Sequence, residues 1–106
     1  MTWIRLCEVE RLTPDRGVAA LVDGRQLAVF RLGTGELYAV DHRDPFSGAN
    51  VLARGLVGDH GGAPTVASPV YKQRFDLRNG ACLDSPDVSI GTWPVREIDG
   101  VIEVGV

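Results

Sequence analysis

Three turn-forming dipeptides restrict the fold of this chain more than any other feature. Asp23-Gly24, Asn79-Gly80 and Asp99-Gly100 each separate two short apolar or alternating segments. Such dipeptides readily adopt the positive φ angles that two-residue β-hairpin turns require. With 13 glycines and 6 prolines in the chain, little length remains for helices. The sequence therefore predicts an almost entirely β protein.

The dipeptides predict three hairpins, and Gly33-Thr34-Gly35 adds a further strand to the first of them. Pro94 has no backbone N–H, so its strand is expected at a sheet edge or a bulge. The predicted pairs are 18–22 with 26–31 followed by 36–40, 74–77 with 81–83, and 92–98 with 101–104.

The stretch 41–69 has neither helical nor strand periodicity and is rich in Gly, Asp, His and Pro. Long loops of this kind usually carry function. Within it, 50–58 fits either a short strand or a helical turn. His42 is expected to be a solvated loop histidine.

Composition narrows the class of protein. A chain of 106 residues with 44% apolar and 24% charged residues is expected to form one soluble domain, 1–106. Its net charge of −3 makes nucleic acid a poor partner, and no apolar run approaches the ~20 residues of a membrane helix.

Without a signal-peptide pattern, the expected location is the cytoplasm. Cys7 and Cys82, 75 positions apart, are expected to be reduced thiols.

Catalytic and metal motifs are lacking. His42 and His60 each have an aspartate neighbour, but no nucleophile elbow, phosphate loop or close-spaced metal-ligand pair accompanies them. This chain alone is not expected to be a catalyst. Basic residues gather at Lys72, Arg74 and Arg78, with Arg43 and Arg54 upstream. The first three share strand parity, so they form either the polar side of a half-buried strand or a surface for an acidic partner.

The order of the segments resembles a Rieske [2Fe-2S] ferredoxin domain. In that family a strand ending in Tyr-Ala leads to C-x-H, and a second loop, C-P-x-H-G, leads to a strand containing Phe-Asp. The matching segments here are 35–41 and 68–80. The resemblance implies an antiparallel β-sandwich with an inserted, loop-rich subdomain at 41–80.

The four ligand positions of that pattern hold other residues. Asp44 and Ser68 stand at the cysteine positions, and Phe46 and Tyr71 at the histidine positions. Phenylalanine offers no lone pair, and the other three are oxygen donors that cannot replace thiolate and imidazole. The expectation is a Rieske-like fold with no cofactor of its own.

The motifs D-P-F-S at 44–47 and S-P-x-Y-K-Q-x-F-D-L at 68–77 are similar to those of the small subunit of assimilatory NAD(P)H-dependent nitrite reductase. That resemblance implies an accessory chain in a complex that reduces nitrite to ammonium. FAD, siroheme and an iron–sulfur cluster would then reside on a large catalytic subunit, the expected partner.

The residues expected to contact that partner are Phe46, Tyr71, Lys72, Gln73 and Arg74. Phe46 and Tyr71 could instead fill the space that a cluster would take. Two other functions stay open. The chain could be a Rieske-type electron-transfer component with an unrecognised ligand set, or an independent Rieske-like binding module of another oxidoreductase.

Overall fold

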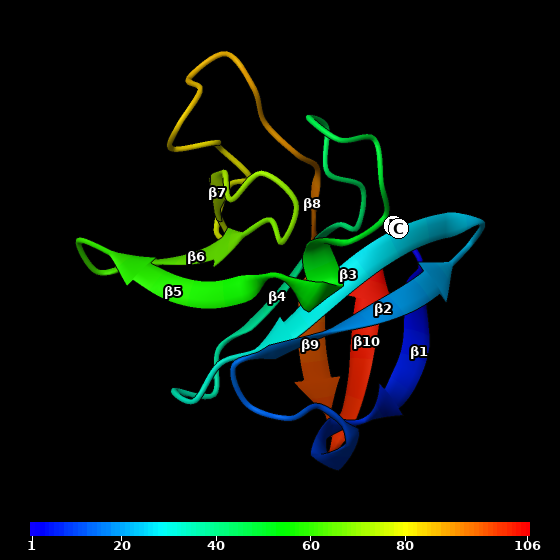
Figure 1. Cartoon of the computed structure of the whole chain (residues 1–106). Helices are drawn as coiled ribbons and strands as arrows, with labels where there is room; N and C mark the ends of the chain where they lie inside the picture. Colours follow the sequence, from blue (N-terminus) through cyan, green and yellow to red (C-terminus); the bar gives the residue numbers. More distant parts are fainter.

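The computed structural model describes residues 1–106, which form ten strands and two short 3-10 turns (Figure 1). All three sheets are antiparallel. The first has the order β1-β10-β9, the second β2-β3-β4-β8 and the third β5-β6-β7. No helix in the structure is long and apolar enough to cross a bilayer. The elements are β1 (Trp3–Glu8), η1 (Val9–Arg11), β2 (Arg16–Val22), β3 (Arg25–Arg31), β4 (Leu37–Asp41), η2 (Leu52–Arg54), β5 (Leu56–His60), β6 (Ala63–Ala67), β7 (Arg74–Asp76), β8 (Thr92–Trp93), β9 (Val95–Ile98) and β10 (Val101–Gly105).

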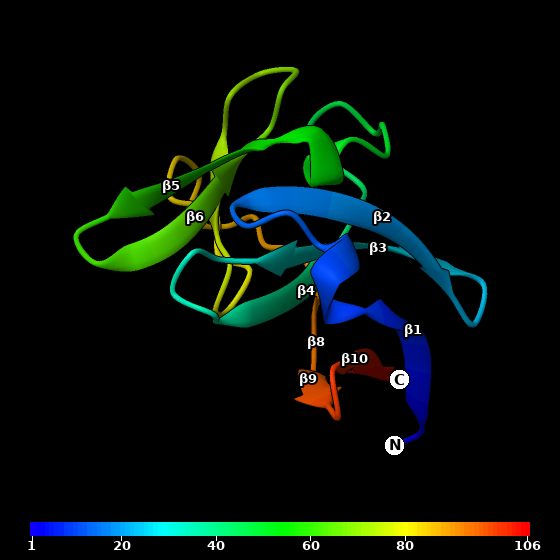
Figure 2. The same ribbon diagram turned by 90° about the horizontal axis from the view of Figure 1, so that it is seen from below.

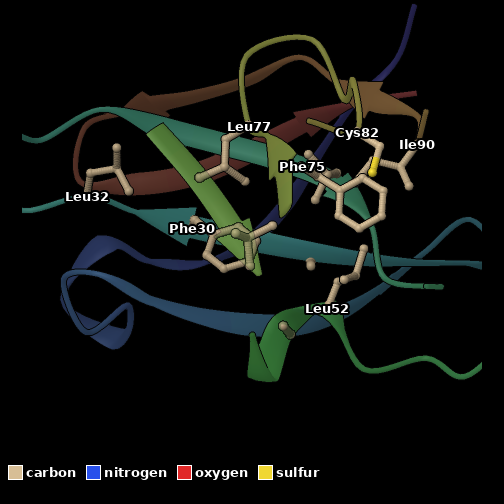
Figure 3. Packing of buried hydrophobic residues seen from close by; sticks show 11 residues of the cluster. Phe30, Leu32, Leu52, Phe75, Leu77, Cys82 and Ile90 are labelled. Carbon is tan, nitrogen blue, oxygen red and sulfur yellow. The ribbon is translucent and has the colours of Figure 1, made fainter. Parts of the chain in front are cut away.

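The second sheet is the middle of three layers, as Figure 2 shows. Successive side chains of a strand point to opposite faces, and β3 is buried on both. Leu27 and Val29 pack with the first sheet around Ile102. Ala28 and Phe30 belong to a separate cluster that contains Phe75, Leu52 and Cys82 and is drawn in Figure 3. The third sheet and its loops are inserted between β4 and β8 and are held by this second cluster.

Two of the three predicted hairpins are confirmed, except that residues 92–93 of the predicted strand 92–98 form β8 and pair with β4 instead of β10. At the β2–β3 turn Asp23 and Gly24 have φ angles of 50° and 78°, and at the β9–β10 turn Asp99 and Gly100 have 51° and 79°. Positive φ at both central residues defines the type I′ turn, whose twist matches that of the strands it joins. The local sequence therefore sets these two registers.

The predicted hairpin at Asn79-Gly80 forms with a wider turn. The Gly80 N–H donates to the Asp76 carbonyl, so the loop spans four residues, and Cys82 meets Phe75 only through an isolated bridge. Gly80 has φ +78°, and a Cβ there would lie 2.0 Å from the Ile90 carbonyl oxygen. Glycine is required here by conformation and by this close approach.

Two regions differ from the sequence prediction. The stretch 41–69 is not irregular throughout, because β5 and β6 form a hairpin closed by Gly61 and Gly62. Residues 50–58, for which the sequence allowed either a short strand or a helical turn, contain both: η2 is followed by the start of β5. The sequence also did not predict β1, which pairs with β10 at the far end of the chain. Pro94 lies between β8 and β9, where the chain passes from the second sheet to the first.

Candidate functional site

The first loop of the site, residues 42–51, begins at a buried histidine. His42 is 5% exposed, and its Nδ1 accepts a 3.1 Å hydrogen bond from the Ala53 N–H. Its carbonyl accepts from the N–H groups of Val51 and Leu52. Burial, reinforced by the charge of Arg54, lowers the pKa of the imidazole. The expectation of a solvated histidine is wrong, because His42 joins the first loop to η2.

Asp44, in the same loop, is a fully buried carboxylate with several donors around it. Its Oδ1 accepts from the Phe46 N–H at 2.9 Å, and its Oδ2 accepts from the Ser47 hydroxyl at 3.1 Å. Burial alone would raise the pKa of Asp44, but hydrogen bonds led by that from Ser68 outweigh it and hold the pKa below its ordinary value. Asp44 is therefore an anion at neutral pH.

The second loop, residues 68–73, is closed on itself and tied to the first. The Ser68 N–H donates to the Gln73 carbonyl, and the Lys72 N–H donates to the Ser68 carbonyl. The Ser68 hydroxyl donates to Asp44 Oδ2 at 2.6 Å, with both residues fully buried. We refer to the two joined loops as the tip. The two cysteine positions of the Rieske pattern are thus linked by one hydrogen bond.

The two histidine positions have different environments. Phe46 is half-buried beside the second cluster, and its ring centroid lies 6.2 Å from that of Phe75. Tyr71 is 62% exposed and, with the 43% exposed Val70, stands at the surface of the second loop. Phe46 therefore packs against the second cluster, whereas Tyr71 is exposed and open to contact with a partner.

The remaining interface candidates also separate. Lys72 is exposed, with φ +67°, and its Nζ donates to the Pro69 carbonyl. Gln73 is half-buried, and its Oε1 has no hydrogen-bond partner. Arg74 forms a bidentate ion pair with Asp84, with Nη2–Oδ1 at 3.0 Å and Nε–Oδ2 at 3.3 Å.

The predicted positive face of one strand is wrong. β7 ends at Asp76, so Lys72 and Arg78 lie outside it. Arg74 pairs with Asp84, and Arg78 pairs with Asp76, whose pKa this hydrogen-bonded pair lowers.

The side chains at the four ligand positions of the Rieske pattern are not the cysteines and histidines that hold a [2Fe-2S] cluster. The Asp44 carboxylate and the Ser68 hydroxyl are engaged with each other, and the Phe46 ring offers no ligand atom. No three His, Cys, Asp or Glu side chains come together as a metal-binding group. Cys7 and Cys82 are both free, the first on β1 and the second in the core. The donors that a [2Fe-2S] cluster prefers are therefore missing from the tip.

Comparison with known proteins agrees with this architecture. Residues 2–105 match the family model described as the Rieske-like [2Fe-2S] domain. The nitrite reductase (NADH) small subunit of Salmonella typhimurium is 39% identical over 96% of this chain and 95% of its own length. The chain belongs to the nitrite reductase small-subunit family. Members of this family have the Rieske-like fold, and the predicted fold class is confirmed.

Two further relatives and one solved structure are similar to this chain. The nitrite reductase [NAD(P)H] large subunit of Klebsiella oxytoca is 43% identical over 97% of this chain, which spans only 11% of that protein. The anthranilate 1,2-dioxygenase ferredoxin subunit of Burkholderia cepacia is 31% identical over 98% of this chain and 92% of its own. A crystal structure from Mycobacterium tuberculosis, named as a candidate NADH-dependent nitrite reductase small subunit, has a TM-score of 0.95 and 48% identity over 97% of this chain and 93% of its own.

The sequence identified the positions of the site but not the interactions among them. The Rieske pattern placed Asp44 and Ser68 at equivalent loop positions, which is the signal that could have predicted their hydrogen bond. Nothing in the sequence indicated that His42 would be buried or that Asp84 would pair with Arg74.

Proposed function

We propose that this chain is the accessory small subunit of a cytoplasmic NAD(P)H-dependent nitrite reductase, and that it holds no iron–sulfur cluster of its own. FAD, siroheme and an iron–sulfur cluster would reside on the large catalytic subunit. The observation that carries the proposal is the buried hydrogen bond from Ser68 to Asp44. It joins the two loops directly, in the place where a metal would otherwise join them, and so keeps the shape of the tip without a cofactor.

The Klebsiella relative supports the large subunit as the partner. A region similar to this whole chain forms 11% of that large-subunit protein, whereas the Salmonella small subunit is matched over 95% of its length. One domain that exists both inside the large-subunit chain and as a separate subunit is expected to work beside the same catalytic body in either arrangement.

The arrangement of the chain ends fits such a complex. The N–H of Thr2 donates to the Val106 carbonyl, and the N–H of Val106 donates to the Thr2 carbonyl. Both ends therefore leave from one place on the first sheet, and Figure 2 places them on the opposite side from the tip. A covalent connection at the ends would leave the tip free to contact the rest of the enzyme.

An electron-transfer role would require ligands for a cluster. The ferredoxin relative makes this the main competing function, but Asp44, Ser68 and Phe46 offer neither the thiolate nor the imidazole donors that hold a Rieske-type [2Fe-2S] cluster. We therefore assign the chain to binding, and electron transfer to the large subunit.

Co-expression with the cognate large subunit tests the proposal. A tagged small subunit is expected to retain the large subunit on an affinity column, and its omission is expected to lower nitrite-dependent NAD(P)H oxidation by the large subunit. Full activity of the large subunit alone, together with no retention, would contradict the proposed function.

A further inference from the structure

Four cations on and beside the tip have no carboxylate partner. Arg43 lies in the first loop, Arg54 ends η2, Lys72 lies in the second loop and Arg16 begins β2. All four are exposed. The three ion pairs of the structure involve other residues: Arg74 with Asp84, Arg78 with Asp76, and Arg96 with Glu103. These four side chains are therefore available to an external partner.

The segments that carry them are fixed relative to one another. The hydrogen bond from Ser68 to Asp44 ties the second loop to the first, and that from Ala53 to His42 ties η2 to the first loop. Figure 2 shows the first loop, the second loop and η2 on the same side of the molecule. The cations of these segments thus belong to one surface rather than to independent mobile loops.

The two loops and η2 carry no exposed carboxylate. Between 42 and 56, and again between 68 and 73, the only acidic residue is Asp44, which is fully buried. After the second loop, the first exposed carboxylate along the chain is that of Asp84, and it pairs with Arg74. A chain with a net charge of −3 therefore presents a basic surface at its tip.

The surface also contains exposed apolar side chains and a hollow. Leu56 is 78% exposed, and its register partner Ala67 directly precedes the second loop, which carries the exposed Val70 and Tyr71. Arg16, Arg54 and Leu56 line a hollow of about 440 Å³. Asp15 also lines it, with its carboxylate bound to the Gly33 N–H. An aromatic and aliphatic centre with a polar rim is the usual composition of a protein interface.

We propose that this basic surface, formed by Arg16, Arg43, Arg54 and Lys72 around Leu56, Val70 and Tyr71, docks onto a carboxylate-bearing surface of the large subunit. The inference rests on the proposed function and specifies the chemistry of the partner. Charge complementarity of this kind mainly accelerates encounter, whereas the apolar centre mainly slows dissociation. The partner surface is accordingly expected to place Asp or Glu side chains around an apolar depression.

Binding kinetics with the purified cognate large subunit test this surface. We expect Arg54→Glu and Lys72→Glu each to weaken association about tenfold, mostly through a slower on-rate. Arg5→Glu makes the same change of charge on β1, at an exposed position on the side of the chain ends, and serves as the matched control. It is expected to change the affinity less than about twofold. Tyr71→Ala is expected to raise the off-rate with little effect on the on-rate.

Ionic strength and a competitor complete the test. Raising the salt from about 0.05 M to about 0.5 M is expected to slow association of the wild type much more than that of an Arg54→Glu, Lys72→Glu double variant. Poly-L-glutamate is expected to compete with the large subunit, and poly-L-lysine is not. Circular dichroism confirms that each variant is folded before it is compared.

The outcomes separate the two proposals. Tight wild-type binding that is affected neither by salt nor by the charge reversals at Arg54 and Lys72 would overturn the basic docking surface and leave the accessory-subunit function in place. A weakening by Arg5→Glu equal to that by Lys72→Glu would also overturn it, since net charge rather than the tip would then act. A wild-type chain that neither binds the large subunit nor affects its activity would overturn the proposed function and this inference together.

Discussion

The hydroxyl of Ser68 donates a 2.6 Å hydrogen bond to the buried carboxylate of Asp44, across two loops that lie 24 positions apart in the sequence. The Rieske pattern places cysteine ligands of one iron at these positions. In this chain the two loops are joined by a charge-assisted hydrogen bond between fully buried groups. The stability of the tip should therefore depend on this pair.

Removing the donor should destabilise the fold. Ser68→Ala leaves a buried carboxylate without its shortest hydrogen bond, and we expect the free energy of unfolding to fall by about 2 kcal/mol. Ser47→Ala removes a longer hydrogen bond to the same oxygen at a partly buried site, and should cost about 1 kcal/mol or less. Urea unfolding measures both free energies. Equal destabilisation by the two substitutions would show that the hydrogen bond between the loops contributes no more than the one within the first loop.

The same carboxylate should give an acid-dependent stability. The folded pKa of Asp44 lies below its ordinary value of 3.8, so the stabilisation is complete above that value and is lost as the pH falls through the folded pKa. Asp44→Asn should lower stability at neutral pH and flatten its decline below pH 3.8. The decline is measured by unfolding at a series of pH values. An unchanged acid limb in the variant would assign the decline to other carboxylates.

His42 should act in a higher pH range. Burial lowers its pKa below the ordinary 6.5, so the neutral form is favoured in the folded state, and stability falls as the pH drops from 6.5 toward the folded pKa. His42→Asn keeps an acceptor near the Ala53 N–H but does not titrate. The variant should lose the part of the pH dependence that lies just below 6.5, measured by thermal unfolding between pH 7 and 5. If both proteins decline alike, His42 does not titrate in this range.

Phe46 and Tyr71 should differ in their effects on stability although both occupy histidine positions of the Rieske pattern. Phe46→Ala removes a ring that packs on Phe75, and should cost about 2 kcal/mol. Tyr71→Ala changes a largely exposed side chain and should cost less than about 0.5 kcal/mol. Denaturant unfolding compares them directly. A large loss of unfolding free energy in Tyr71→Ala would mean that this ring packs against the protein and is not available to a partner.

The lysine at position 72 should lower the stability of the fold but strengthen binding to the large subunit. Its φ of +67° is a conformation that glycine adopts readily and lysine does not, and the Rieske pattern has glycine at this position. We expect Lys72→Gly to raise the free energy of unfolding by up to about 1 kcal/mol while weakening association with the large subunit. A variant that is both less stable and fully competent in binding would contradict this separation.

Local turn chemistry made much of the fold predictable. Asp23-Gly24 and Asp99-Gly100 carry their own backbone preference, so their hairpins follow from a few neighbouring residues. β1 has no such turn, because its partner β10 is at the other end of the chain. In β5 and β6, Gly58 and Pro64 weaken the strand signal, and the pairing depends on packing against the second cluster.

The site was less predictable than the fold because its properties depend on contacts between distant residues. Alignment to the Rieske pattern located Asp44 and Ser68, but their burial and hydrogen bond arise only when the two loops meet. Likewise, Lys72, Arg74 and Arg78 are equivalent charges in the sequence. Only the positions of Asp84 and Asp76 separate the two paired arginines from the free lysine.

Measurement of iron and acid-labile sulfide tests directly whether the chain holds a [2Fe-2S] cluster. Protein purified without oxygen would be analysed for both and examined by visible spectroscopy. We predict less than about 0.1 iron per chain and no visible bands, because Asp44, Phe46, Ser68 and Tyr71 do not supply the thiolate and imidazole ligands of a [2Fe-2S] cluster. Two irons and two sulfides per chain would contradict the proposed cluster-free accessory subunit and make the chain an electron carrier.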